Sequence, residues 1–239
     1  MSERIAKFIA RSGVCSRRAA EELIMQKRVT VNGETVSSPA FNVDGNEKIL
    51  IDGEKLPSIE QTRLWLYYKP VGLITSHKDA SRPTVFENLP SNMPRVISVG
   101  RLDLNSEGLL LLTNDGELSR MLELPQNGWS RRYKVKVHGI ISQQKIDSVS
   151  NGVTIEGVNY GPVKITIDST QGTNTWLTIT LTEGKNREIR RLMQYIGLDV
   201  ARLIRLSYGP FQLGSLKKGE VKEVPHKVLK EQLGGKFEL

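Results

Sequence analysis

One stretch of the sequence reads Gly100-Arg101-Leu102-Asp103-Leu104-Asn105-Ser106-Glu107-Gly108, followed by four leucines and then Thr113-Asn114-Asp115-Gly116. Its Asp103 stands between two leucines, with an arginine two positions earlier. A carboxylate in apolar surroundings costs free energy unless it is paired and hydrogen-bonded. The pattern therefore predicts a buried acid, which serves either a structural ion pair or a chemical reaction. Residue types alone favour the structural ion pair.

The composition is that of a globular chain without a membrane span. Its 239 residues, 38% of them hydrophobic, suffice for two domains or one large one. No run of about 18 apolar residues is present, and the N-terminus lacks the apolar core of a secretion signal. The single Cys15 cannot form an internal disulfide, and no Cys/His cluster has zinc-ligand spacing. We therefore expect a cytoplasmic protein that needs no metal.

The charge is strongly basic, with a formal net charge of +8. Such a balance favours a polyanionic partner. Up to residue 28 the chain carries seven basic and three acidic side chains, whereas residues 29–60 carry two and six. The positive charge of this region is therefore concentrated in its first segment.

The first 55 residues have the pattern of a small module of helices and strands. Residues 3–11 carry apolar side chains at helical spacing, and Ser16 is placed to cap a second helix. A strand at residues 29–31 runs into Asn32-Gly33, a strong hairpin signal, and residues 49–51 with Asp52-Gly53 repeat the pattern. Two basic helices on a small β-meander would form a compact unit with a marginal core.

This module resembles an S4 RNA-binding domain. The resemblance rests on Arg4-Ile5-Ala6-Lys7-Phe8-Ile9-Ala10, Ser16-Arg17-Arg18-Ala19-Ala20-Glu21 and Lys27-Arg28-Val29-Thr30-Val31-Asn32-Gly33. It implies an RNA-binding domain over residues 1–58 whose basic face lies against phosphates and reads RNA shape. The implied RNA contacts are Arg4, Lys7, Arg11, Arg17, Arg18, Lys27 and Arg28. The alternative is that this charged face is simply solvated.

The remainder of the chain is predicted to be α+β. Residues 56–63 are polar and favour an interdomain linker. Strands are expected at residues 64–68, 96–99, 131–137, 163–167, 176–181, 200–206 and 221–224, and helices at 117–124, 143–149, 186–196 and 227–233. The absence of a regular βαβ alternation favours a mixed, mainly antiparallel sheet with flanking helices.

Common catalytic motifs are missing from the sequence. There is no Walker A loop, no dinucleotide-binding glycine motif, no zinc-protease motif and no serine-hydrolase elbow. A lone Asp, a Tyr on a strand and an Arg-rich helix remain. Such a set could isomerise a bound uracil from an N-glycosidic to a C-glycosidic link, because that reaction is redox-neutral and needs no net water. An arginine would keep the acid charged, and an aromatic ring would hold the detached base.

The second region resembles the pseudouridine synthases, in the bacterial rRNA branch typified by RsuA. The resemblance is carried by the motif at residues 100–116 together with Lys69-Pro70-Val71-Gly72, Arg132-Tyr133-Lys134-Val135, Glu183-Gly184-Lys185-Asn186-Arg187-Glu188-Ile189-Arg190-Arg191-Leu192 and Leu203-Ile204-Arg205-Leu206-Ser207-Tyr208-Gly209-Pro210. Ser106 and Tyr68 depart from the family's usual Thr and Asn. The resemblance implies a catalytic domain over residues 59–239.

The resemblance also implies roles for five residues. Asp103 matches the catalytic acid, and Arg190 matches the residue that pairs with its carboxylate. Tyr133 matches the ring that stacks on the target uracil. Arg101 matches a residue that fills the gap left by a flipped nucleotide, and Leu203 an apolar pocket wall. Whether Asp103 attacks the sugar, attacks the base or removes a proton stays open.

The sequence therefore predicts an rRNA pseudouridine synthase that uses no cofactor. Large-subunit 23S rRNA is favoured as the target over small-subunit 16S rRNA. The substrate would be an rRNA stem-loop, either free or in a ribosome assembly intermediate, and the enzyme would be a monomer with no membrane partner. The alternative from another class is a non-catalytic rRNA-binding assembly factor, against which the intact set of Asp103, Tyr133 and Arg190 argues.

Overall fold

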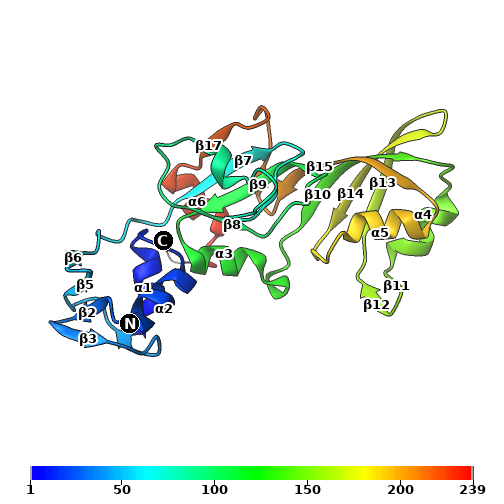
Figure 1. The fold of residues 1–239 in the computed structure, drawn as a ribbon. Coiled ribbons are helices and arrows are strands. Elements are labelled where there is room, and N and C mark those ends of the chain that lie inside the picture. The colour runs from blue at the N-terminus through cyan, green and yellow to red at the C-terminus, as the bar shows by residue number, and fades with distance from the viewer. Residues whose placement is uncertain (1, 238) are drawn as a thin grey trace.

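The computed structural model describes residues 2–237 and 239. A small N-terminal unit and a long sheet with flanking helices follow one another along the chain (Figure 1). The predicted α+β class is confirmed. Among the described helices, none has the length and apolar character needed to cross a bilayer.

The N-terminal unit has its own apolar core of ten buried residues, centred on Ile5, Ile9 and Ile24. Its elements are β1 (Glu3–Arg4), α1 (Ile5–Arg11), α2 (Arg17–Met25), β2 (Val29–Val31), β3 (Glu34–Val36), β4 (Asn42–Val43), β5 (Ile49–Ile51) and β6 (Glu54–Lys55). Ser16 caps α2 as predicted, accepting a 3.1 Å hydrogen bond from the Ala19 amide. The two predicted hairpin turns are also confirmed.

The second unit is built on a nine-stranded sheet in the order β13-β14-β10-β15-β9-β7-β17, with β16 on β15 and β8 on β9. Its strands are β7 (Leu64–Lys69), β8 (Ile97–Val99), β9 (Glu107–Thr113), β10 (Arg131–His138), β13 (Lys164–Gln171), β14 (Asn174–Leu181), β15 (Asp199–Tyr208), β16 (Phe211–Gln212) and β17 (Val221–Glu223). Its helices are α3 (Gly116–Glu123), α4 (Gln143–Ser150), α5 (Glu188–Tyr195) and α6 (His226–Leu233), with 3₁₀ turns at Phe86–Asn88 and Pro125–Asn127. A separate hairpin, β11 (Val153–Ile155) and β12 (Val158–Tyr160), was not predicted.

Two apolar cores lie on opposite faces of this sheet. Every residue of β9 is buried. Leu110 and Leu112 belong to the core shared with α4 and α5, and Leu109 and Leu111 to the core shared with α3 and α6. This alternation is what a strand buried on both faces requires. The apolar run of the opening motif is thus the centre of the fold.

The two halves of the sheet join where β9 runs parallel to β15. The register pairs Glu107 with Ile204 and Gly108 with Arg205. Gly108 has φ +105°, and a Cβ there would lie 2.4 Å from the Arg205 carbonyl oxygen. Only glycine fits this crossing, which fixes the strand directly behind the loop that carries Asp103.

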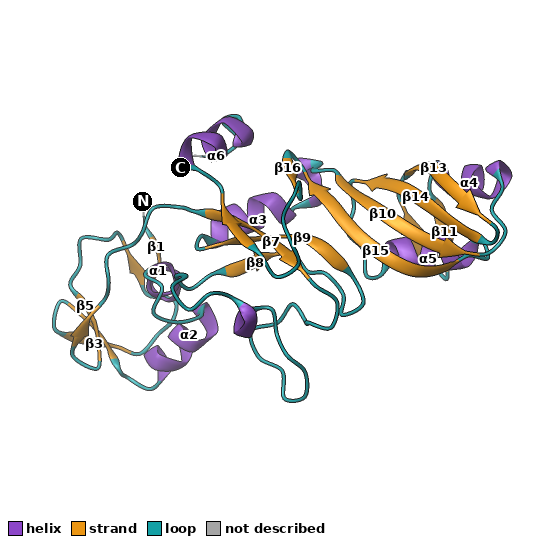
Figure 2. Ribbon diagram, turned by 90° about the horizontal axis from the view of Figure 1, so that it is seen from above, coloured by secondary structure: helices purple, strands orange, loops and turns teal. Residues whose placement is uncertain are grey.

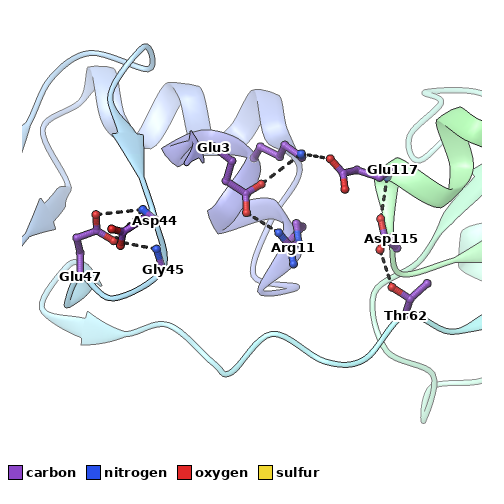
Figure 3. Close-up of polar contacts among 9 residues, drawn as sticks. Glu3, Arg11, Asp44, Gly45, Glu47, Thr62, Asp115 and Glu117 are labelled. Atoms are coloured by element: carbon purple, nitrogen blue, oxygen red, sulfur yellow. Dashed lines mark hydrogen bonds and ion pairs between the residues drawn. The ribbon is translucent and has the colours of Figure 1, made fainter. Parts of the chain in front are cut away.

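The linker ends on the Thr113-Asn114-Asp115 segment (Figure 3). The Thr62 hydroxyl donates a 2.6 Å hydrogen bond to Asp115, which also caps α3 by accepting from the Glu117 amide at 2.7 Å. The Asn114 side chain accepts from the Arg63 amide at 2.8 Å. This part of the motif therefore has a structural role, because it fixes the start of the second unit.

One ion pair connects the two units. Lys7 on α1 contacts Glu117 at the start of α3 and also Glu3 at 3.4 Å (Figure 3). Partial burial works against the charged form, but these carboxylates outweigh it and raise the pKa of Lys7. Lys7 thus faces the second unit, and this contact competes with its predicted use as an RNA ligand.

Candidate active site

A cleft of about 740 Å³ opens beside the crossing of β9 and β15. Three segments form most of it: the 100–106 loop, the residues of β10, β14 and β15 on one sheet face, and the 183–189 segment at the start of α5. Thr75, Ser98, Glu123 and Pro125 complete the lining. Of the five residues with predicted catalytic or substrate roles, Arg101, Asp103, Tyr133 and Leu203 line this cleft. Arg101 and Leu203, which are 102 positions apart in the sequence, therefore meet at one place only because the sheet brings them together.

The Asp103 side chain is 36% exposed. The prediction of a buried carboxylate was therefore wrong. Leu102, the preceding residue, is the one that is buried, at 7% exposure. The apolar neighbours anchor the loop in the core, and the acid remains solvated at the cleft, where it avoids the cost of desolvation.

Lys69 holds the backbone of this loop through hydrogen bonds from the buried side. Its side chain is fully buried, and its ammonium donates hydrogen bonds to the carbonyl oxygens of Pro70 at 3.0 Å, Asp103 at 3.0 Å and Ser106 at 2.9 Å. Three carbonyls match the three donors of an ammonium group. Burial lowers the pKa of Lys69 to about 8. No role was predicted for this lysine, because its acceptors are backbone atoms that only the fold brings together.

Replacing Lys69 by methionine should impair catalysis more than folding. Met fills a similar volume but leaves three carbonyls without their donor, so that the Asp103 loop loses its position. We expect kcat to fall about 10- to 100-fold, because small misplacements of a reacting group have effects of that size. Lys78→Met, at an exposed loop position, is the matched control and should stay within twofold of the parent. An unaltered kcat for Lys69→Met would contradict the role.

Turnover should also fall as the pH rises through about 8. The pKa of Lys69 in the folded chain lies below its usual 10.5. Between these values the unfolded chain holds a proton that the folded chain has released, so this group favours folding increasingly as the pH rises. The neutral amine, however, has one donor fewer for the loop. Kinetic measurements at pH 7–9.5 should therefore show that kcat decreases, whereas thermal melts over the same range should show no decrease in Tm caused by Lys69. In the Lys69→Met variant, the decrease of kcat near pH 8 should be absent.

Arg190 anchors the same loop through the backbone. Its guanidinium donates to the carbonyl oxygens of Asn105 at 2.8 Å and Val200 at 3.1 Å. Burial lowers its pKa, as does neighbouring Arg187, against the opposing charge of Asp103. Within the described residues Arg190 forms no ion pair of 4.0 Å or less with Asp103, so the predicted direct pairing is absent from this arrangement.

Arg187 is the cation nearest to the carboxylate. Its Nη1 lies 4.0 Å from Oδ2 of Asp103. The residue precedes α5 in the left-handed region, with φ +52°. Because this conformation is not helical, α5 begins at Glu188 rather than at the predicted residue 186. None of the roles implied by the family resemblance falls on Arg187.

Tyr133 and Leu203 form the apolar wall of the cleft. They come from β10 and β15 and are 8% and 6% exposed. Arg101, on the 100–106 loop, is exposed. An aromatic ring beside an aliphatic wall offers a flat planar base a face on which to stack.

Two buried arginines also line the cleft, and the sequence did not single them out. Arg131 donates to the Thr182 carbonyl at 2.6 Å, and its guanidinium lies 4.5 Å above the Tyr208 ring centroid. Arg205 donates to the Leu109 carbonyl at 2.7 Å, and its Nη2 is buried without a hydrogen-bond partner among the described residues. The strict alternation in β10 could have placed Arg131 on the face of Tyr133. The cleft is thus suited to an anionic, aromatic ligand.

A family model described as "RNA pseudouridylate synthase" matches residues 63–195, more than half of the chain. The chain belongs to the pseudouridine synthase family. The synthase is 48% identical over 235 residues to an uncharacterized RNA pseudouridine synthase of Rickettsia typhi, covering 98% of this chain and 96% of that protein. It is 42% identical to "Ribosomal large subunit pseudouridine synthase B" of Yersinia pestis, covering 89% and 69%. A crystal structure of a pseudouridylate synthase matches with a TM-score of 0.68 at 27% identity, covering 96% and 99%.

The synthase also carries an S4 domain, whose family model matches residues 3–49. Several of the predicted RNA contacts of this domain are engaged with carboxylates. Arg11 contacts Glu3, Arg17 contacts Glu21 at 3.3 Å, and Arg28 contacts Asp52. Arg4 donates to the Ala40 carbonyl, and Arg18 and Lys27 are exposed. The Arg17–Glu21 and Arg28–Asp52 pairs are exposed and therefore weak, so a phosphate can displace the carboxylate.

Proposed function

We propose that this synthase isomerises one or a few uridines of large-subunit 23S rRNA, with Asp103 as the catalytic acid. The observation that carries the proposal is that Asp103, Tyr133, Leu203 and Arg101 line one cleft. The 42% identity to a large-subunit pseudouridine synthase supports the choice of rRNA. Small-subunit 16S rRNA remains the alternative target.

The reaction requires one bond to break and one to form. The N1–C1′ bond of uridine breaks, the ring turns, and a C5–C1′ bond replaces it, while C5 loses a proton and N1 gains one. Asp103 stands at the cleft to act on the sugar or the base. Tyr133 stacks on the uracil and is placed to receive the C5 proton, and Leu203 closes the apolar side. Enclosure keeps the detached ring at a high effective concentration.

Three arginines have separate roles in this reaction. Arg187 brings a positive charge to 4.0 Å from the Asp103 carboxylate, where it orients that group. Arg190 positions the reacting loop through the Asn105 carbonyl. Arg101, exposed at the rim, occupies the space that a uridine leaves when it flips out of its stack.

Base-resolution mapping of pseudouridine in total rRNA tests this function. Cells with and without the gene are compared, and the full chain is returned on a plasmid as the control. We expect one or a few 23S positions to lose the modification and regain it on complementation. Loss confined to 16S rRNA would select the alternative target. An unchanged map with defective ribosome assembly would favour a non-catalytic assembly factor.

The exposed basic residues of the S4 domain should contribute to rRNA affinity mainly through electrostatic attraction. We take residues 1–58 as the docking domain and residues 59–239 as the catalytic domain. Replacing Arg17, Arg18 and Lys27 by glutamine removes three exposed charges. The slope of log K against log salt for 23S rRNA should become shallower by up to about 2–3, since each lost contact to duplex phosphate contributes about 0.9. An unaltered slope in filter binding would refute docking by this face.

The remaining expectations stay predictions. They are a monomeric, cytoplasmic enzyme without a cofactor, acting on a stem-loop of free rRNA or of an assembly intermediate.

A further inference from the structure

Four neighbouring strands of the sheet have one open face. α4 and α5 lie against one side of β13, β14, β10 and β15, and Figure 2 views the other side, which no described element covers along most of these strands (Figures 1 and 2). Val135, Leu177 and Ile179 on the covered side are fully buried. We call the open side, which lies opposite the cleft residue Tyr133, the back face.

The register gathers basic side chains on the back face. Directly paired residues share a face, and residues two apart along a strand do as well. Arg132 pairs with Thr180, Lys134 with Thr178, and Lys136 with both Trp176 and Arg202. Lys164 at the sheet edge is also opposite Thr180. The basic residues of the back face are therefore Arg132, Lys134, Lys136, Lys164 and Arg202.

Only two of these five cations are matched by a carboxylate. Lys134 pairs with Asp168 at 2.8 Å, and Arg202 pairs with the buried Glu107. Arg132 donates to the neutral Gln212 side chain at 3.0 Å. Among the residues that the structure describes, no carboxylate lies within 4.0 Å of the charged groups of Arg132, Lys136 or Lys164. Three of the five cations on the back face therefore have no ion-pair partner among the described residues, although the exposed Asp199, opposite His138, adds a carboxylate to this face.

An aromatic ring lies among these cations. Trp176 is only half-buried, and the Lys134 ammonium lies 5.8 Å from its ring centroid. Its cross-strand neighbour is Lys136, one of the unmatched cations. A half-buried tryptophan on an open sheet face has a surface on which a base can stack. Cations along a sheet with an aromatic ring between them are the combination that binds unpaired nucleic acid.

We propose that the back face binds a single-stranded RNA segment, separate from the one that enters the cleft. Phosphates lie along Arg132, Lys136 and Lys164, and one base stacks on Trp176. Because β10 presents Tyr133 to the cleft and its even-numbered neighbours to the back face, the two RNA segments approach opposite sides of one sheet. The proposal presupposes an RNA substrate and adds a contact outside both the cleft and the S4 domain.

Binding of a fluorescein-labelled adenosine dodecamer tests the proposal. This probe is unpaired and contains no uridine, so it cannot be a substrate of the cleft. The full chain is compared with a triple variant, Arg132→Gln, Lys136→Gln and Lys164→Gln. The matched control, Lys222→Gln, Lys227→Gln and Lys230→Gln, removes the same charge from exposed positions on β17 and α6. Thermal melts verify that both variants are folded.

The back-face variant should make the slope of log K against log salt shallower by about 2, since each single-strand phosphate contact contributes about 0.7. The control should leave this slope within about 0.5 of the parent. Trp176→Leu should weaken binding about five- to tenfold with little change in slope. Equal behaviour of the two triple variants would overturn the proposal, and unchanged binding by Trp176→Leu would overturn the stacked base. Because no turnover is measured, either result is independent of whether Asp103 makes pseudouridine.

Discussion

Asp103→Asn should abolish pseudouridine formation, with turnover reduced by about a thousandfold or more, while RNA affinity stays within about threefold. Asparagine has nearly the same shape but carries no charge and cannot act as a nucleophile or base. Within the described residues, the only ion pair of the Asp103 side chain is the 4.0 Å contact with Arg187, so the loop loses little when the charge goes. The backbone remains held by Lys69 and Arg190. Tritium release from C5-labelled uridine in 23S rRNA measures the reaction directly.

A second carboxylate in the cleft provides the matched control. Glu123 also lines the cleft and is exposed, and the Ser119 hydroxyl donates to it. Glu123→Gln should retain turnover within about threefold, because this carboxylate belongs to α3 rather than to the catalytic loop. Comparable loss in both variants would indicate a general electrostatic effect of the cleft. Full activity of Asp103→Asn would exclude this residue from the chemistry.

Gly108→Ala should destabilise the second unit by about 3 kcal/mol or more, or prevent its folding. The added Cβ would lie 2.4 Å from the carbonyl oxygen and 2.6 Å from the amide nitrogen of Arg205, at φ +105°. Both contacts are to backbone, so relief requires β9 and β15 to separate. This crossing joins the two halves of the sheet and supports the Asp103 loop. Thermal melts should show Tm lowered by roughly 10 °C.

Gly116→Ala is the matched control. Gly116 begins α3 without a positive φ, and its nearest neighbour would be the Ile97 Cδ1 at 3.9 Å. Alanine there should leave stability within about 1 kcal/mol or raise it, because it favours the helix. A Gly108→Ala protein that melts like the parent would show that the crossing accepts a side chain.

Local patterns predicted most of the secondary structure. The alternation in β10 and the Asn32-Gly33 turn depend on neighbouring residues, and both are present in the structure. The start of α5 was misplaced because the left-handed conformation of Arg187 has no signal in residue type. The β11–β12 hairpin was missed although its Glu156-Gly157 turn, with both φ values positive, is a form of the two-residue hairpin loop.

The sequence predicted which residues belong to the site better than it predicted which of them contact one another. The family resemblance named four residues that line the cleft. It could not tell that Arg187 rather than Arg190 lies nearest to Asp103, because that depends on how α5 docks on the sheet. The prediction that Asp103 is buried was wrong for a related reason. Apolar neighbours in the sequence indicate that a loop is anchored in the core, but they do not indicate where each side chain points. The role of Lys69 could not be predicted from the sequence, because its hydrogen-bond partners are backbone carbonyl oxygens.

The most direct test of the account is the treatment of unmodified full-length 23S transcript with the purified full chain, followed by mapping of pseudouridine at single-base resolution. We predict modification at one or a few discrete uridines, with one C5 proton released for each pseudouridine formed and none in the Asp103→Asn reaction. Tight binding of the transcript without any pseudouridine would contradict the account.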